Sequence, residues 1–267
     1  MIINIEKSFL PFARWQPYNE KQLQMWYADE MPEKTKEGYV FKAVKDEKYF
    51  KTDKWYKNEY PNKVLTTIPY KVHYIRSISQ ELVEEYKENN WTGLPEDVEP
   101  VPDFNTGIYT FKVKVQRKLG CFDCIGWLIY RGYTGKPYRE IDFAEHFVTK
   151  RKIFGISIPF TKKQFFRFAI HQAGKKQIKQ DVVIRKKIYK KCKGEFTIEM
   201  EWQEDKIVFS LRVENGVNSA FVWVFDYDKE TLKNLREAKY DLVMNAGTTD
   251  GKDGKEHSII LKEFAYV

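Results

Sequence analysis

The chain has 267 residues, of which 42% are hydrophobic and 16% aromatic, and its 46 Lys and Arg exceed its 38 Asp and Glu, for a formal net charge of +8. This apolar content supports a real core, and the length suits one large β domain or two small ones. No run approaches the roughly 18 apolar residues of a membrane span, and aromatic residues do not interleave with the basic run as a base-stacking platform requires, so neither a spanning segment nor a nucleic-acid partner is expected.

The first 60 residues combine many charges with aromatic side chains. These aromatic residues include Trp15, Trp26, Tyr27, Trp55 and Tyr56. We expect residues 1–60 to supply edge strands or an arm that docks on a partner, and residues 61–267 to form the main part of one compact domain. The beginning of the chain carries an acid early and has no apolar core followed by a small-residue cleavage site, so no signal peptide is predicted.

The next elements are read from periodicity and from turn-forming residues. Residues 63–76 are predicted to be a pair of strands around Pro69, because their side chains alternate. Residues 79–89 are predicted to be a helix, since Ser79 can cap it and apolar residues recur at helical spacing. Residues 90–103 contain three prolines and a glycine and are predicted to be a long loop.

From residue 107 onward, short runs rich in Val, Ile, Tyr and Phe alternate with turns, a pattern typical of an all-β sandwich. A short helix is predicted at 229–239. The segment 175–193 holds nine Lys or Arg. It could be a patch for an acidic glycan, a nucleic acid or a protein partner, but residues 181–193 are read first as an exposed hairpin with solvated lysines.

Residues 140–145 read Glu-Ile-Asp-Phe-Ala-Glu inside a predicted strand. In a regular strand, Glu140 and Asp142 share a face and Glu145 points to the other. A β-bulge of one residue would return Glu145 to the shared face, and bulges are over-represented beside active sites. Without the bulge the hexamer is an ordinary solvated strand; with it, three acids converge on one cleft.

Two carboxylates that flank a glycosidic bond can hydrolyse it, one as nucleophile and the other as general acid. A third acid can hydrogen-bond the nucleophile and influence which carboxyl keeps the proton. Like charges at close range also push the pKa values of such groups apart.

The hexamer resembles the Glu-x-Asp-x-x-Glu signature of glycoside hydrolase family 16, the laminarinase, lichenase, agarase and carrageenase group. Further blocks resemble strands of that family in the same order: residues 106–115, 126–129, 196–202, 206–212, 240–247 and 258–267. The resemblance covers the chain from about residue 104 to its end. It implies a concanavalin A-like β-jelly roll, a sandwich of two antiparallel sheets with one or two short helices.

The resemblance also implies roles. Glu140 would be the nucleophile, Glu145 the general acid/base and Asp142 the assisting carboxylate of a retaining, endo-acting hydrolase of a β-glucan or galactan. Trp127 could flank the cleft or belong to the core. His171 resembles a cleft histidine, although a lone His between apolar residues is read first as structural.

Asn245 could border the cleft or form a turn before Ala-Gly. The sequence also departs from the family pattern. Arg139 replaces the Gly that usually precedes the nucleophile, and it would favour ionised Glu140 if its side chain reached that face. The Cys121-Phe-Asp-Cys124 loop replaces an aromatic position. These departures leave open a second interpretation, a non-catalytic glycan-binding, attachment or structural protein on the same fold.

No cofactor is required by either interpretation, and no metal site is assigned. Cys121 and Cys124 form a C-x2-C pair without a second pair, so free thiols or one local bridge, with Cys192 left over, are favoured over a four-ligand zinc site. The family sometimes carries a structural calcium, which no acidic cluster in this sequence indicates. The expected partner is a polysaccharide, and the expected location is outside the cell or on a virion, such as a phage particle.

Overall fold

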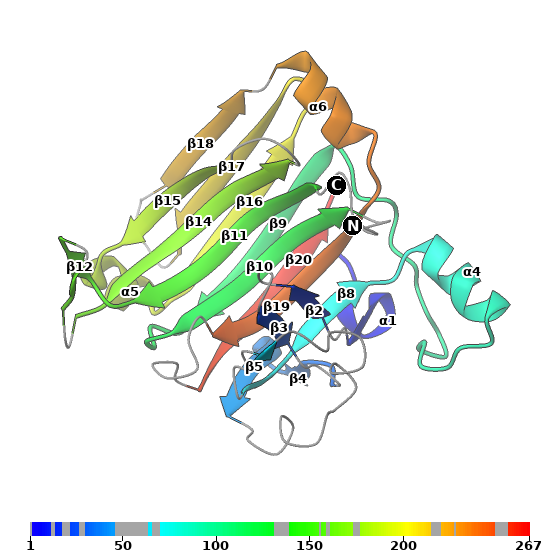
Figure 1. Ribbon diagram of the computed structural model, residues 1–267, viewed down its shortest axis with the longest axis horizontal. Coiled ribbons are helices and arrows are strands. Elements are labelled where there is room, and N and C mark those ends of the chain that lie inside the picture. Colours follow the sequence, from blue (N-terminus) through cyan, green and yellow to red (C-terminus); the bar gives the residue numbers. More distant parts are fainter. Residues whose placement is uncertain are drawn as a thin grey trace.

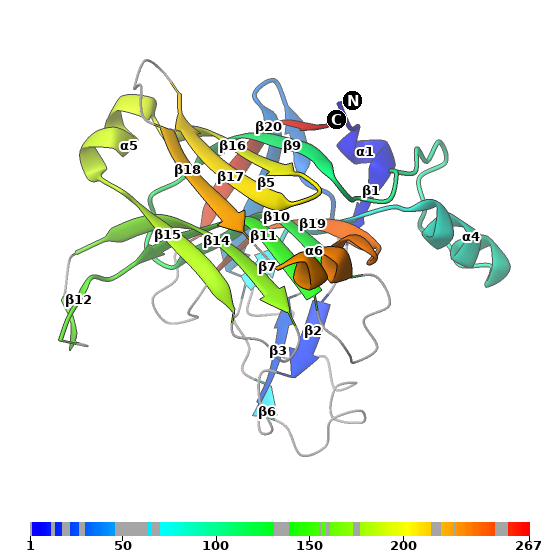
Figure 2. The same ribbon diagram turned by 90° about the horizontal axis from the view of Figure 1, so that it is seen from above.

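The computed structural model describes residues 2–11, 14–17, 22–26, 30–45, 64–65, 70–130, 139–154, 156–158, 161–172, 177–214, 220–226, 228–248 and 256–267. Two large antiparallel sheets are stacked face to face, as Figures 1 and 2 show. The predicted fold class, a β-jelly-roll sandwich with few short helices, is confirmed. No helix in these ranges combines the length and the apolar character that crossing a membrane would need.

The sheet that carries the acidic hexamer has seven strands. In spatial order they are β1 (Phe9–Pro11), β8 (Tyr74–Ser77), β19 (Tyr240–Thr248), β10 (Cys121–Tyr130), β11 (Arg139–Thr149), β14 (Lys163–Gln172) and β15 (Ile178–Ile184). The hexamer lies on β11, near the middle of this order. Both of its neighbours, β10 and β14, can therefore contribute side chains to the same surface.

The opposing sheet has eight strands. Its order is β18 (Ala220–Asp226), β17 (Lys206–Val213), β16 (Glu195–Trp202), β9 (Gly107–Val115), β20 (His257–Tyr266), β5 (Gly38–Lys45) and β4 (Glu33–Thr35), with β7 (Tyr70–Val72) paired to β5. Each block of the family resemblance therefore coincides with a strand.

Two small sheets and four helices complete the described chain. The small sheets join β2 (Arg14–Pro17), β3 (Gln22–Trp26) and β6 (Val64–Leu65), and β12 (Lys152–Ile153) with β13 (Ile156–Ser157). The helices are α1 (Ile5–Ser8), α4 (Gln80–Glu88), α5 (Lys186–Cys192) and α6 (Lys229–Arg236). The first 60 residues supply two edge strands, β1 in the seven-stranded sheet and β4 in the eight-stranded sheet. The division of the chain at residue 60 stays a prediction.

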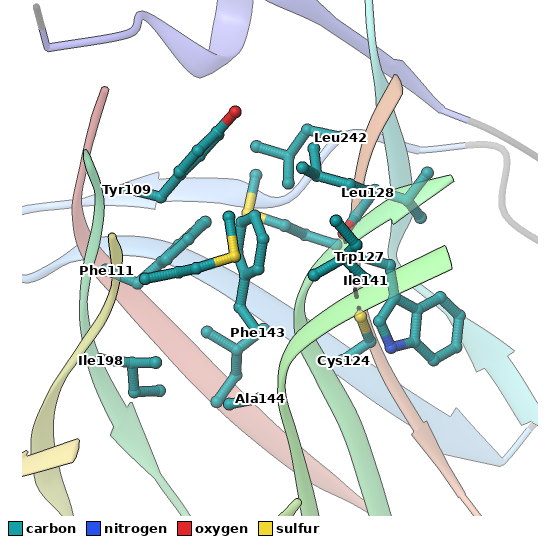
Figure 3. Packing of buried hydrophobic residues seen from close by; sticks show 14 of the residues in the cluster. Tyr109, Phe111, Cys124, Trp127, Leu128, Ile141, Phe143, Ala144, Ile198 and Leu242 are labelled. Carbon is teal, nitrogen blue, oxygen red and sulfur yellow. Dashed lines mark hydrogen bonds between the residues drawn. The ribbon is translucent and has the colours of Figure 1, made fainter. Parts of the chain in front are cut away.

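Aromatic rings fill the space between the large sheets. Phe143 of β11 lies 4.9 Å from Tyr109 and 5.6 Å from Phe111 of β9, measured between ring centroids, and Phe111 stacks on Phe264 at 4.6 Å. Figure 3 shows Phe143 pointing from its strand toward Tyr109 and Phe111. Each such ring, fully buried, contributes roughly 1.5–3 kcal/mol, so the core holds β11 firmly in place.

A charged network is also buried between the sheets. Asp123 of β10 accepts hydrogen bonds from His146 of β11 (2.8 Å) and from His257 of β20 (2.7 Å), and all three side chains are inaccessible to solvent. Gln164 lies 3.0 Å from the other ring nitrogen of His146. Because a buried charge is tolerated only when paired and hydrogen-bonded, this network ties β20 to the acid-bearing sheet.

Two predicted helices are confirmed. α4 begins after Ser79, whose hydroxyl accepts a hydrogen bond from the Leu82 amide at 3.2 Å. Leu82 and Val83 are buried on its inner face, and Trp91 closes the segment by an edge contact with Tyr86. α6 occupies most of the predicted 229–239 segment.

Strands lie on both sides of Pro69, a residue outside the described ranges, as predicted. They belong to different sheets: β6 joins β3, β7 joins β5, and β8 joins β1 and β19.

The prediction for residues 181–193 is wrong. Residues 181–193 are not a hairpin, because β15 ends at Ile184 and α5 follows. Ile188 and Tyr189 of α5 pack against the core and Cys192 is buried, so this packing favours a helix where an exposed hairpin was predicted.

Candidate active site

The predicted bulge is present in β11. Asp142 pairs with Ala169 and Glu145 pairs with Arg167 on β14, so three steps along β11 match two along β14. The neighbouring β10 also has one extra residue at this level, because Cys124 pairs with Asn245 of β19 and Trp127 pairs with Val243, so three steps along β10 match two along β19. The irregularity therefore runs across two adjacent strands at the level of the acids.

The bulge directs all three acids to the outer face of the seven-stranded sheet. Phe143 and Ala144, the two residues between Asp142 and Glu145, both face the core and are 0% exposed. Figure 3 shows them pointing toward the opposing sheet, while Trp127 and Cys124 lie on the other side of the strands. The acids themselves are largely buried, with exposures of 6% for Glu140, 0% for Asp142 and 8% for Glu145.

A glycine allows this geometry. Gly126 lies in the irregular part of β10, where a Cβ atom would come within 2.7 Å of the Phe143 ring and 2.9 Å of the Phe111 ring. No larger residue fits between the bulge and the core without moving these rings. The bulge in β11 therefore depends on a small residue, Gly126, in the adjacent strand β10.

The environment of Glu145 favours its protonated form. Burial, together with the negative charge of Glu140, raises the pKa of Glu145 to about 8, while Arg167 opposes the increase. Arg167 is held by two hydrogen bonds to Asp181, at 2.8 and 3.2 Å. Glu145 is therefore mostly a neutral acid at pH 7, able to donate a proton.

His171 joins the acids from β14. Its Nε2 lies 3.0 Å from Asp142 Oδ2, 3.9 Å from Glu140 Oε1 and 2.8 Å from the side-chain amide of Gln177. Burial lowers the pKa of His171, although the charge of Glu140 acts in the opposite direction. The ring is thus mostly neutral at pH 7, and with a 28% exposed side chain it lies at the border between the acids and solvent.

The other predicted site residues lie beside or beneath the acids. Trp127 pairs with Asp142 in register, packs on Phe122 at 6.0 Å and is only 4% exposed, which favours a packing role. Asn245 is not in a turn: it lies within β19, 4% exposed, and its Oδ1 accepts a hydrogen bond from the Cys124 amide at 3.4 Å.

Three residues near the acids were not singled out from the sequence as site residues. Arg167 lies opposite Glu145 on β14. The sequence could have indicated it, because Arg167 and His171 are an even number of residues apart and therefore share a face of the predicted strand. Gln177 lies just before β15, and nothing in the sequence pattern indicated that it would approach the acids. Cys124 also lies opposite Glu145, and burial with the charges of the three acids raises the pKa of its thiol well above the usual value.

Arg139 does not reach the acids. Its guanidinium donates to the carbonyl of Asn234 at 2.5 Å and lies over the Tyr130 ring at 5.6 Å. The substitution of Gly by Arg before Glu140 therefore places no positive charge on the acid face. The three cysteines are buried free thiols, as the first of the two sequence readings predicts.

Among the residues that the structure describes, two groups of side chains have ligand atoms close enough to approach one cation. These are Glu140, Asp142 and His171, and Cys121, Asp123 and His257, with atoms within 4.8 Å of one another in each group. In the second group Asp123 is already hydrogen-bonded to His146 and His257. The first group contains two of the three acids, Glu140 and Asp142, together with His171.

Known structures share this fold at low sequence identity. The chain matches the laminarinase catalytic domain of Thermotoga maritima with a TM-score of 0.56 and 13% identity, over 91% of this chain and 82% of that one. It matches a mixed-linkage glucan family-16 enzyme of Bacteroides ovatus, solved with its G4G4G3G product, with a TM-score of 0.56 and 13% identity, over 100% and 97%. An endo-acting O-glycanase of the human gut microbiota that initiates mucin breakdown matches with a TM-score of 0.51 and 14% identity, over 99% and 86%.

No protein-family model and no curated protein matches the chain. The similarity to solved structures therefore defines the class of fold, that of the family-16 glycoside hydrolases. In these matches it covers 91% to 100% of the chain.

Proposed function

We propose that this protein is a retaining, endo-acting glycoside hydrolase of a β-glucan or galactan type of polysaccharide. The observation that carries the proposal is the bulge in β11, because it gathers Glu140, Asp142 and Glu145 on one face of a glycosidase-like fold. Several structural neighbours are endo-glucanases, which supports a polysaccharide as the substrate.

Each acid has a role in this proposal. Glu145, with its pKa raised to about 8, donates a proton to the glycosidic oxygen as the bond breaks. The carboxylate of Glu140 attacks the anomeric carbon, forming a glycosyl ester, and Glu145 then removes a proton from the water that hydrolyses this ester. Asp142, within hydrogen-bond distance of His171, orients the nucleophile.

The test compares Glu140→Gln with Glu145→Gln on two kinds of substrate. On polysaccharides screened from β-1,3-, β-1,4- and mixed-linkage glucans, agar and carrageenan, both variants should lose activity. On an aryl glycoside with a dinitrophenolate leaving group, Glu145→Gln should still release dinitrophenol, because this leaving group needs no protonation. Glu140→Gln should release none.

The thermal unfolding of both variants serves as the folding control. A Glu140→Gln variant that folds and keeps full activity would refute the assigned nucleophile. Proton NMR of the first product formed distinguishes retention from inversion at the anomeric carbon. If the native protein binds these glycans without forming product during long incubation, the alternative of a non-catalytic glycan-binding protein replaces the hydrolase.

A further inference from the structure

A second feature of the acid-bearing face is a cavity of about 680 Å³ at the end where β11 finishes and β14 begins. Its lining includes Lys150, Lys152, Lys163 and Arg167, with Phe165 and Asp181. We call this cavity the basic groove. Lys152 of β12 and Ser157 of β13 both line it, and Figure 1 shows the hairpin of β12 projecting from this end of the sheet.

The basic groove is continuous with the acids along β14. Arg167, Phe165 and Lys163 alternate on that strand and pair with Glu145, Phe147 and Thr149 of β11. Alternate residues of a strand share a face, so the groove lies on the same surface as the acids and Arg167 belongs to both. A polymer that passes the acids in this direction enters the groove.

The charge of the groove is strongly one-sided. Between Glu145 and Asp181 the sequence holds nine Lys or Arg and no Asp or Glu. Asp181, the one carboxylate of the lining, is bound to Arg167. Among the residues that the structure describes, no carboxylate forms an ion pair with Lys152 or Lys163. These two ammonium groups are therefore available to an anion.

Stacked rings position the cations. Phe122, Phe147 and Phe165 form a row across three strands, with centroids 4.8 and 4.9 Å apart. The Lys163 ammonium lies 4.9 Å from the Phe165 centroid, and the Arg167 guanidinium lies 5.0 Å from that of Phe147. Cation–π attraction restricts both side chains to the groove, which lowers the entropic cost of binding an anion.

We propose that the basic groove binds the anionic substituents, sulfate or carboxylate groups, of an acidic polysaccharide whose backbone continues to the three acids. The inference rests on the proposed function and narrows its substrate class. A nucleic acid fits less well, because a chain with a phosphate at every residue would also pass the acids of β11 and be repelled there. A polysaccharide can carry its charges only on the sugars that lie in the groove.

Binding is measured by calorimetry in a Glu140→Gln background, so that the polymers stay intact. The probes are laminarin, sulfated laminarin, laminarin oxidised to carboxylates at C6, carrageenan and desulfated carrageenan, with a single-stranded DNA oligomer for comparison. Each anionic polymer is compared with the neutral polymer of the same backbone. Preference for the sulfated or for the oxidised form identifies the anion.

The variant Lys152→Gln/Lys163→Gln should weaken binding of the preferred anionic polymer roughly tenfold at low salt, since two exposed charge contacts are lost. Binding of its neutral form should not change. The control, Lys87→Gln/Lys229→Gln, removes the same charge from exposed lysines of α4 and α6 and should have little effect. Thermal unfolding confirms that both variants fold.

The proposal is overturned if the neutral polymers bind as tightly as the anionic ones, or if no anionic polymer binds. It is also overturned if the control variant loses as much affinity as the groove variant, or if DNA binds more tightly than every glycan. These results are independent of catalysis. Groove-dependent binding without hydrolysis refutes the hydrolase and keeps the groove, whereas hydrolysis of neutral polymers alone keeps the hydrolase and refutes the groove.

Discussion

The pH dependence of hydrolysis depends on the protonation of Glu145. Burial and the charge of Glu140 raise the pKa of Glu145 to about 8. If Glu145 is the general acid, it is about 90% protonated at pH 7 and about 10% protonated at pH 9. We therefore expect kcat/KM to fall with rising pH, with a midpoint near pH 8 and a tenfold loss for each pH unit above it.

Replacement of Arg167 by Gln tests the cause of this value. Arg167 stabilises ionised Glu145, so its removal should raise the pKa of Glu145 and move the descending limb to higher pH. Two charges about 6 Å apart interact by roughly 3 kcal/mol at an effective dielectric constant of about 20. Solvent reaches Arg167, whose side chain is 22% exposed, and reduces this interaction, so we expect a displacement of about half to one pH unit.

The displacement is measured from kcat/KM profiles and, independently, by carbon NMR titration of the Glu145 carboxyl group, assigned by comparison with Glu145→Gln. The control is Arg212→Gln, which breaks a similar ion pair, at 2.8 Å from Glu199, on the eight-stranded sheet. A limb that moves to lower pH, or that moves equally in the control, contradicts the assigned electrostatics. A profile without a descending limb between pH 7 and 9 removes Glu145 as the general acid.

Two further predictions concern the support of the site. Gly126→Ala should destabilise the fold by about 1–3 kcal/mol, because its Cβ would overlap the rings of Phe143 and Phe111, and chemical denaturation should show this with a loss of activity; unchanged stability would contradict the close packing. Burial opposes the positive charge of His257, but the charge and the hydrogen bond of Asp123 outweigh it and raise the pKa of His257 to about 11. The stabilisation that charged His257 gives to the fold is therefore complete below pH 6.5 and declines as the pH rises toward 11. His257→Gln should therefore cost about 3 kcal/mol in urea unfolding at pH 6 and clearly less at pH 9.5, whereas an equal cost at both values would show that Asp123 does not hold a charged His257.

Much of the fold could be read from local sequence patterns. Apolar alternation located the strands from residue 107 onward, and the Ser79 cap located α4, because both signals arise from neighbours in the chain. The bulge was also predictable. Acids at offsets 0, 2 and 5 can share a face of a strand only if one residue is inserted, and the register of β11 contains that insertion.

Other features depended on contacts between distant segments. The basic residues 186–192 form α5 because Ile188, Tyr189 and Cys192 pack against the core. The number of lysines in the segment does not indicate this packing. The pairing of β7 and β8 with different sheets depended on competition among strands. Asn245 stayed within a strand because β10 and β8 flank it on both sides.

The sequence by itself determined that Glu140 and Asp142 face the same way, because side-chain direction along a strand follows from residue spacing. It showed that Glu145 could join them only through a bulge, which the register of β11 against β14 contains. Only the tertiary structure decided what surrounds them. Burial of Glu145, the approach of His171 and Arg167 and the joining of Lys152 with Lys163 in one groove arise from strands side by side in space. Electrostatic effects depend on distance and on exclusion of water, and neither quantity is written in the order of residues.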